Sequence, residues 1–144
     1  MSTDHEIPSS SLSVVRKAWI HRATSGEAKD CLLFLDGELY TERVKALDIL
    51  REAEAAGALS PVTCVYLPNA SAAGRHADYT CNAAFADFLA REMPPWIERE
   101  TGRFERVFLC GLSLSALQAV FTALRHPGVF AGVLAQSPSA WWQD

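Results

Sequence analysis

The chain has 144 residues, the length of about one domain. Hydrophobic residues make up 49% and charged residues 21%, which excludes a disordered segment and allows a buried core. The net charge of -4, without a block of like charges, argues against binding to nucleic acid or to an acidic membrane surface. The longest apolar runs have about five residues, where a membrane-spanning helix needs about 20, and the first residues lack the pattern of a secretory signal.

The N-terminal segment 1–12 is polar and contains Pro8 and a run of serines, so we predict a flexible arm followed by one domain over 13–144. Residues 14–22 alternate in hydrophobicity and predict a strand near the edge of a sheet. The turn residues 24–26 that follow suit a hairpin loop.

Apolar runs farther along the chain predict strands buried on both faces, as in a parallel sheet. These runs are 31–35, 61–67, 106–110 and 130–135. Helical patterns lie between the runs over 41–56, 82–100 (kinked or divided at Pro94-Pro95) and 114–125, whereas 68–79 is predicted to be a loop. The alternation predicts an α/β fold with a mostly parallel sheet and helices on both faces.

The cysteines are too far apart for a zinc site or a redox pair, and they favour buried free thiols in a reducing cytoplasm. They are Cys31, Cys64, Cys81 and Cys110. The sequence implies neither a metal nor a cofactor.

The segment with the clearest chemistry is Gly111-Leu112-Ser113-Leu114-Ser115, which lies between a predicted strand and a predicted helix. This is the context of a nucleophile elbow, a tight turn that presents a serine hydroxyl and needs small residues two positions before and after it. Ser115 stands where the G-x-S-x-G pattern has its second glycine. The alternative interpretation is that Ser113 caps the helix.

Several segments together resemble the putative esterase family of α/β-hydrolases, nearest to the catalytic domains of enterochelin-esterase-like proteins. The segments are Leu35-Asp36-Gly37-Glu38, the stretch from Arg75 to Pro95-Trp96, Cys110 to Ser115, and the close from Arg125-His126-Pro127-Gly128 to Trp142. The resemblance implies an α/β-hydrolase fold and cleavage of an ester by Ser113 through an acyl-enzyme. Siderophore-type esters are one substrate class that it suggests.

The resemblance also implies an oxyanion hole made by the Leu114 N–H and by an N–H at Gly37 or Glu38. The alternative for Asp36-Gly37 is an ordinary turn. The loop after the last predicted strand supplies candidates for the substrate pocket, although its tryptophans could instead pack as core. These candidates are Ser137, Ser139, Trp141 and Trp142.

The triad of an α/β-hydrolase needs an acid and a histidine after the serine. The residues after Ser113 include one histidine, His126, and one acidic residue, Asp144. His126 stands at the far end of a helix of about 12 residues, roughly 18 Å from its start. We therefore expect a C-terminally truncated domain without the last strands and without a complete triad. A catalytically incomplete remnant or binding module and, more weakly, an acyltransferase are the alternatives. The expected partners are a small ester and, through the exposed edge strand 130–135, a second copy of the chain.

Overall fold

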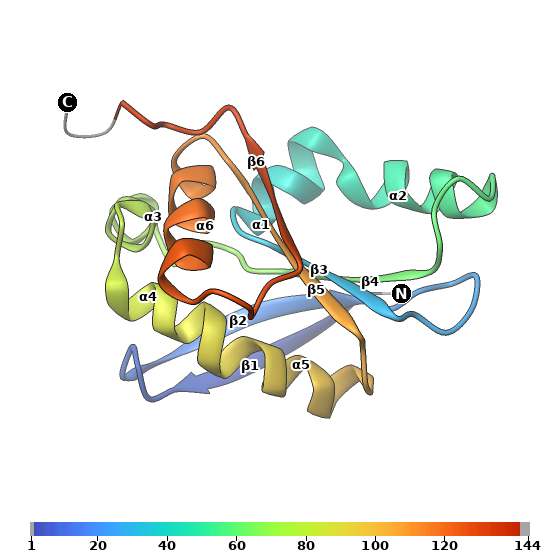
Figure 1. Ribbon diagram of the computed structural model, residues 1–144, viewed down its shortest axis with the longest axis horizontal. Coiled ribbons are helices and arrows are strands. Elements are labelled where there is room, and N and C mark those ends of the chain that lie inside the picture. Colours follow the sequence, from blue (N-terminus) through green and yellow to red (C-terminus); the bar gives the residue numbers. More distant parts are fainter. Residues whose placement is uncertain (1, 142–144) are drawn as a thin grey trace.

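The computed structural model describes residues 2–141 and contains a six-stranded sheet between helices (Figure 1). The strands are β1 (Ser2–Ser9), β2 (Val14–His21), β3 (Asp30–Phe34), β4 (Val62–Tyr66), β5 (Arg106–Leu112) and β6 (Gly132–Gln136). The helices are α1 (Gly37–Leu39), η1 (Tyr40–Val44), α2 (Ala46–Ala55), α3 (Ala72–Tyr79), α4 (Ala83–Asp87), η2 (Phe88–Glu92), α5 (Met93–Thr101) and α6 (Leu114–Arg125). None of the helices in this part of the chain is long and apolar enough to span a membrane.

The sheet has the order β1-β2-β4-β3-β5-β6. Strands β4, β3, β5 and β6 run parallel, and β1 and β2 are antiparallel additions at one edge. The predicted α/β sheet, mostly parallel, is therefore confirmed. The predicted hairpin loop at residues 24–26 is wrong, because β2 pairs with β4 and not with the strand that follows it.

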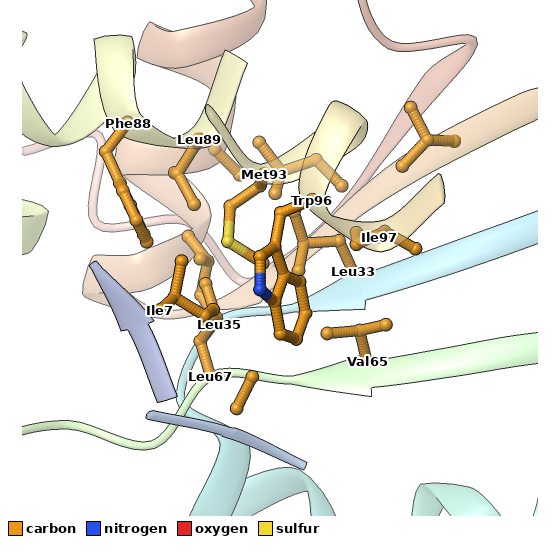
Figure 2. Close-up of a cluster of buried hydrophobic side chains, with 14 of the residues drawn as sticks. Ile7, Leu33, Leu35, Val65, Leu67, Phe88, Leu89, Met93, Trp96 and Ile97 are labelled. Atoms are coloured by element: carbon orange, nitrogen blue, oxygen red, sulfur yellow. The ribbon is translucent and has the colours of Figure 1, made fainter. Parts of the chain in front are cut away.

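The central strands are buried on both faces, as their uninterrupted apolar runs predict. In β3, Leu33 packs into the larger hydrophobic cluster, whereas Phe34 points to the other face and packs with Tyr40 and Tyr66. The larger cluster lies between the sheet and helices α4 to α6, and Figure 2 shows Met93 and Trp96 of α5 above the strands. Helix α2 covers the opposite face (Figure 1), so helices flank the sheet on both sides.

The prediction of a flexible arm over residues 1–12 is wrong for residues 2–9, which form β1. This strand pairs with β2 from Ser2 opposite His21 to Ser9 opposite Val14. Ile7 is buried in the main core, and the Glu92 carboxylate accepts hydrogen bonds from the Ser9 hydroxyl at 2.8 Å and the Ser10 N–H at 2.8 Å. The serine run therefore docks on η2, a long-range contact that its polar composition did not reveal.

Residues 72–79, predicted to be part of a loop, form helix α3. Ser71 caps the helix because its side chain accepts a hydrogen bond from the Gly74 N–H at 2.9 Å. The helix buries Tyr79, which packs edge-on against Phe85. Tertiary packing thus stabilises a short helix that its weak propensity, with Gly74 in its first turn, did not predict.

Three of the four cysteines are buried free thiols, as predicted, but Cys81 is exposed. Burial raises the pKa of the Cys110 thiol to about 12. Cys110 therefore stays a protonated thiol near neutral pH.

Candidate active site

Ser113 occupies a sharp turn between the end of β5 at Leu112 and the start of α6 at Leu114. Its backbone has φ 55° and ψ −117°, and its side chain is exposed. A conformation of this kind costs a residue with a side chain about 1–3 kcal/mol, so the surrounding structure must hold it in place. The Ser113 side chain makes no capping hydrogen bond to α6, which removes the interpretation of this serine as a helix cap.

Gly111 and Ser115 explain how the turn is held. A Cβ atom on Gly111 would lie 2.4 Å from the Ser115 carbonyl oxygen, so a side chain has no room there. Ser115 is fully buried, and its hydroxyl accepts a hydrogen bond from the Leu112 N–H and donates one to the Leu112 carbonyl, both at 2.9 Å. Ser115, which replaces the second glycine of the pattern, thus stabilises the turn through its hydroxyl. The sequence pattern alone did not predict this contact.

The segment after β6 fixes the two sides of the turn. The Ser113 N–H donates to the Gln136 carbonyl at 2.9 Å, and the Ser139 N–H donates to the Ser113 carbonyl at 3.1 Å. The hydroxyls of Ser113 and Ser139 lie 3.2 Å apart. Of the residues predicted to line a pocket, the structure therefore brings Ser139 directly to the candidate nucleophile.

The other residues predicted to line a pocket make no such contact with Ser113 within the described part of the chain. Ser137 is exposed and has a φ of 47°, and the Trp141 side chain is 68% exposed rather than part of the core. Trp142 lies outside the described residues.

The loop after β3 lies at the same edge of the sheet, because β3 and β5 are parallel neighbours with Phe34 opposite Cys110. Gly37 is wrong as an oxyanion donor, since its N–H donates to the Leu67 carbonyl at 2.8 Å. Its lack of a side chain is still needed, because a Cβ there would lie 2.9 Å from the Leu67 carbonyl carbon.

The other two N–H groups that the sequence predicts for an oxyanion hole are not taken by a neighbouring group of the described residues. Within residues 2–141, the N–H groups of Glu38 and Leu114 have no hydrogen-bond acceptor. Each stands at the start of a helix, where N–H groups lack partners within the helix and favour negative charge. Glu38 is therefore the better candidate of the two residues that the sequence proposed for this loop.

Asp36 anchors this loop, a role that was not apparent from the sequence. It has φ 49° and ψ 49°, is fully buried, and accepts hydrogen bonds from Arg75 at 2.7 and 2.8 Å and from the Asn69 amide at 2.7 Å. Its N–H donates to the Tyr79 hydroxyl at 2.9 Å. The hydrogen bonds to Asp36 raise the pKa of Arg75.

A pocket of about 340 Å³ opens beside this loop. It is lined by Glu38, Leu39, Asn69, Ser71, Ala72 and Arg75. Helix α3 supplies part of its wall, so the error at residues 68–79 also hid this pocket from sequence reasoning.

His126 is not the base for Ser113. Its Nε2 lies 2.7 Å from Asp87 Oδ1, at the opposite end of α6 from Ser113. The hydrogen bond with His126 lowers the pKa of Asp87. The hydroxyl partner of Ser113 in the described part of the chain is Ser139.

Comparisons with known proteins identify a family and several relatives of this chain. The family described as putative esterase matches residues 9–144. The iron(III) enterobactin esterase of Dickeya dadantii (strain 3937) is 26% identical over 135 residues, which are 90% of this chain and 31% of that protein.

Solved structures show the same fold. The enterochelin esterase from Shigella flexneri superposes with a TM-score of 0.88 at 24% identity, over 99% of this chain and 37% of that one. A siderophore hydrolase from Aspergillus nidulans gives a TM-score of 0.77 at 18% identity, over 98% of this chain and 58% of that one. The chain thus spans roughly a third of the length of its enterobactin and enterochelin esterase relatives. Because the family match extends over nearly the whole sequence, the chain belongs to the putative esterase family.

Proposed function

We propose that the chain carries the nucleophile and the oxyanion hole of a serine ester hydrolase. The observation that supports this most strongly is the exposed Ser113 hydroxyl at a turn with positive φ, directly before α6. Helix capping does not account for this conformation, and a nucleophile elbow does. The free N–H groups of Leu114 and Glu38 supply the donors that a tetrahedral intermediate needs.

The proposed reaction is an acyl transfer to Ser113. The Ser113 Oγ attacks the ester carbonyl, the bond to the leaving alcohol breaks, and the serine proton leaves with the alcohol or to solvent. Hydrolysis of the resulting acyl-enzyme by water then releases the acid. Both steps need a general base to be fast. Among the described residues, no histidine or carboxylate forms a hydrogen bond with the Ser113 hydroxyl.

The proposed substrates are siderophore-type esters. The relatives include an iron(III) enterobactin esterase and a siderophore hydrolase, and one solved relative from Shigella flexneri was determined in the presence of enterobactin. We also propose the cytoplasm as the location, because the buried free thiols suit a reducing compartment.

An acylation experiment tests this proposal. With an excess of 4-nitrophenyl butyrate, we expect one butyryl group per chain on Ser113, because attack can occur slowly without a base while deacylation stalls. Intact-mass and peptide mass spectrometry would locate the adduct. It should disappear in Ser113→Ala and persist in Ser60→Ala, which removes an exposed hydroxyl from a loop outside the site.

The second candidate is a binding module that retains the elbow without the chemistry. The contact of Ser113 with Ser139, and the contact of His126 with Asp87, favour this reading over a working triad. A folded chain with no adduct on Ser113 would contradict the enzyme proposal and support the binding module.

Self-association through β6 is a further part of the proposal. β6 pairs on one side with β5 and ends the sheet, and its Leu134 side chain is 51% exposed. An apolar edge strand is a template for pairing with another chain. We expect the wild type to form dimers or larger species in size-exclusion chromatography, and Leu134→Lys to shift the chain toward the monomer. Leu124→Lys, which changes an exposed leucine of α6, is the control and should leave the association unchanged. A wild-type chain that stays monomeric at high concentration would contradict this prediction.

A further inference from the structure

The elbow and the oxyanion loop come from segments far apart in the sequence, and one side-chain hydrogen bond joins them. The Tyr40 hydroxyl donates to the Gln136 Oε1 at 2.6 Å. Tyr40 begins η1 directly after α1, the short helix that contains Glu38. Gln136 ends β6 and precedes the segment that returns to Ser113.

Gln136 holds the elbow through its main chain at the same time. Its carbonyl accepts the Ser113 N–H at 2.9 Å, and three residues later the Ser139 N–H donates to the Ser113 carbonyl at 3.1 Å. Ser137, which lies between these two contacts, has a positive φ of 47°. A displacement of Gln136 would therefore move both peptide groups that flank the nucleophile.

The Tyr40 hydroxyl has a clear role only in this bridge. The ring is 1% exposed and packs against Phe34 at a centroid distance of 4.7 Å, a contact that phenylalanine could make equally well. A buried tyrosine hydroxyl needs a hydrogen-bond partner, and here that partner is Gln136. Burial raises the pKa of Tyr40, so the hydroxyl remains a donor at neutral pH.

We propose that Tyr40 and Gln136 are positioning residues that set the placement of the Ser113 hydroxyl relative to the Glu38 N–H. Neither residue is required to touch the substrate. That the bridge affects catalysis rests on the proposed function. That it holds the turn at Ser113 in place does not.

The test compares the rate at which a fluorophosphonate labels Ser113 in the wild type, Tyr40→Phe, Gln136→Met and the double variant. Labelling forms a bond from Ser113 Oγ to phosphorus, breaks the P–F bond and releases fluoride and a proton. Loss of one net hydrogen bond of about 1 kcal/mol predicts labelling about fivefold slower in each single variant. The maximal rate should fall while the concentration for half-maximal rate stays constant.

The double variant and a matched control make the test specific. Because both substitutions break the same bond, the double variant should also be about fivefold slower, where independent effects would give about 25-fold. Tyr66→Phe removes a hydroxyl from another ring that stacks on Phe34 and lies outside the bridge, so it should label at the wild-type rate.

Amide hydrogen exchange gives a second readout that does not need reactivity. Tyr40→Phe should speed exchange at the Ser113 and Ser139 amides about fivefold and leave the Leu109 amide of β5 unchanged. Unchanged exchange and unchanged labelling would overturn the bridge and leave the proposed function intact. A wild-type chain that is never labelled at Ser113 would count against the proposed function, and exchange alone would then decide on the bridge.

Discussion

Gly111→Ala should lower the free energy of unfolding by about 3 kcal/mol and slow the labelling of Ser113 by more than tenfold, since overpacking against rigid backbone reaches the upper end of its usual cost. The added Cβ would meet the Ser115 carbonyl oxygen at 2.4 Å and its carbonyl carbon at 2.6 Å. These are backbone atoms in the first turn of α6, so relief requires the helix to move away from β5. Chemical denaturation and the labelling rate would measure the two effects.

Gly132→Ala is the matched control for this prediction. Gly132 lies in the neighbouring strand β6, and a Cβ there would meet ring atoms of Phe108 at 3.2 Å, which belong to a side chain that can shift. We expect its cost to stay below about 1 kcal/mol. If Gly111→Ala were as stable and as reactive as Gly132→Ala, this would contradict the close packing of β5 against the first turn of α6 at the elbow.

Arg75→Ala should lower the free energy of unfolding by about 3–5 kcal/mol, because it leaves a buried carboxylate without its charged partner. The Asp36 side chain has no solvent exposure, and Arg75 donates two hydrogen bonds to it. Asn69 remains as a neutral donor and cannot balance the charge. The variant should also lose labelling of Ser113, because the displaced loop no longer presents the Glu38 N–H.

The chain offers a matched ion pair at the surface. Arg106 also donates two hydrogen bonds to one carboxylate, that of Asp30, but its side chain is 59% exposed. We therefore expect Arg106→Ala to leave the free energy of unfolding nearly unchanged, because water screens an exposed ion pair. Equal losses for the two variants in urea denaturation would show that burial of Asp36 does not stabilise the loop.

The elements predicted best were those defined by local pattern. The apolar runs of β3 to β6 and the strand-to-helix junction at Ser113 depend on neighbouring residues, so sequence reasoning located them, and Leu114–Arg125 was predicted at the observed bounds. The helical stretch runs without a gap from Ala83 to Thr101, and Pro94 and Pro95 lie in the first turn of α5, directly after the π-helical segment η2.

The errors share a physical cause, since each depends on contacts between distant parts of the chain. β1 forms because Ile7 reaches the core and Glu92 holds the serine run, a partner more than 80 residues away. The Gly37 N–H is taken by Leu67, and Asp36 is paired with Arg75, which belongs to a helix that was predicted to be a loop. Hydrophobic periodicity carries no signal for such pairings.

The most direct test of the central claim is to find which residue of the folded wild-type chain reacts with a fluorophosphonate. If the turn presents Ser113 beside two free N–H donors, peptide mass spectrometry should find the adduct on Ser113 in preference to every other serine, and heat denaturation should abolish the preference. Labelling spread over several serines, or equal before and after denaturation, would contradict the nucleophile elbow.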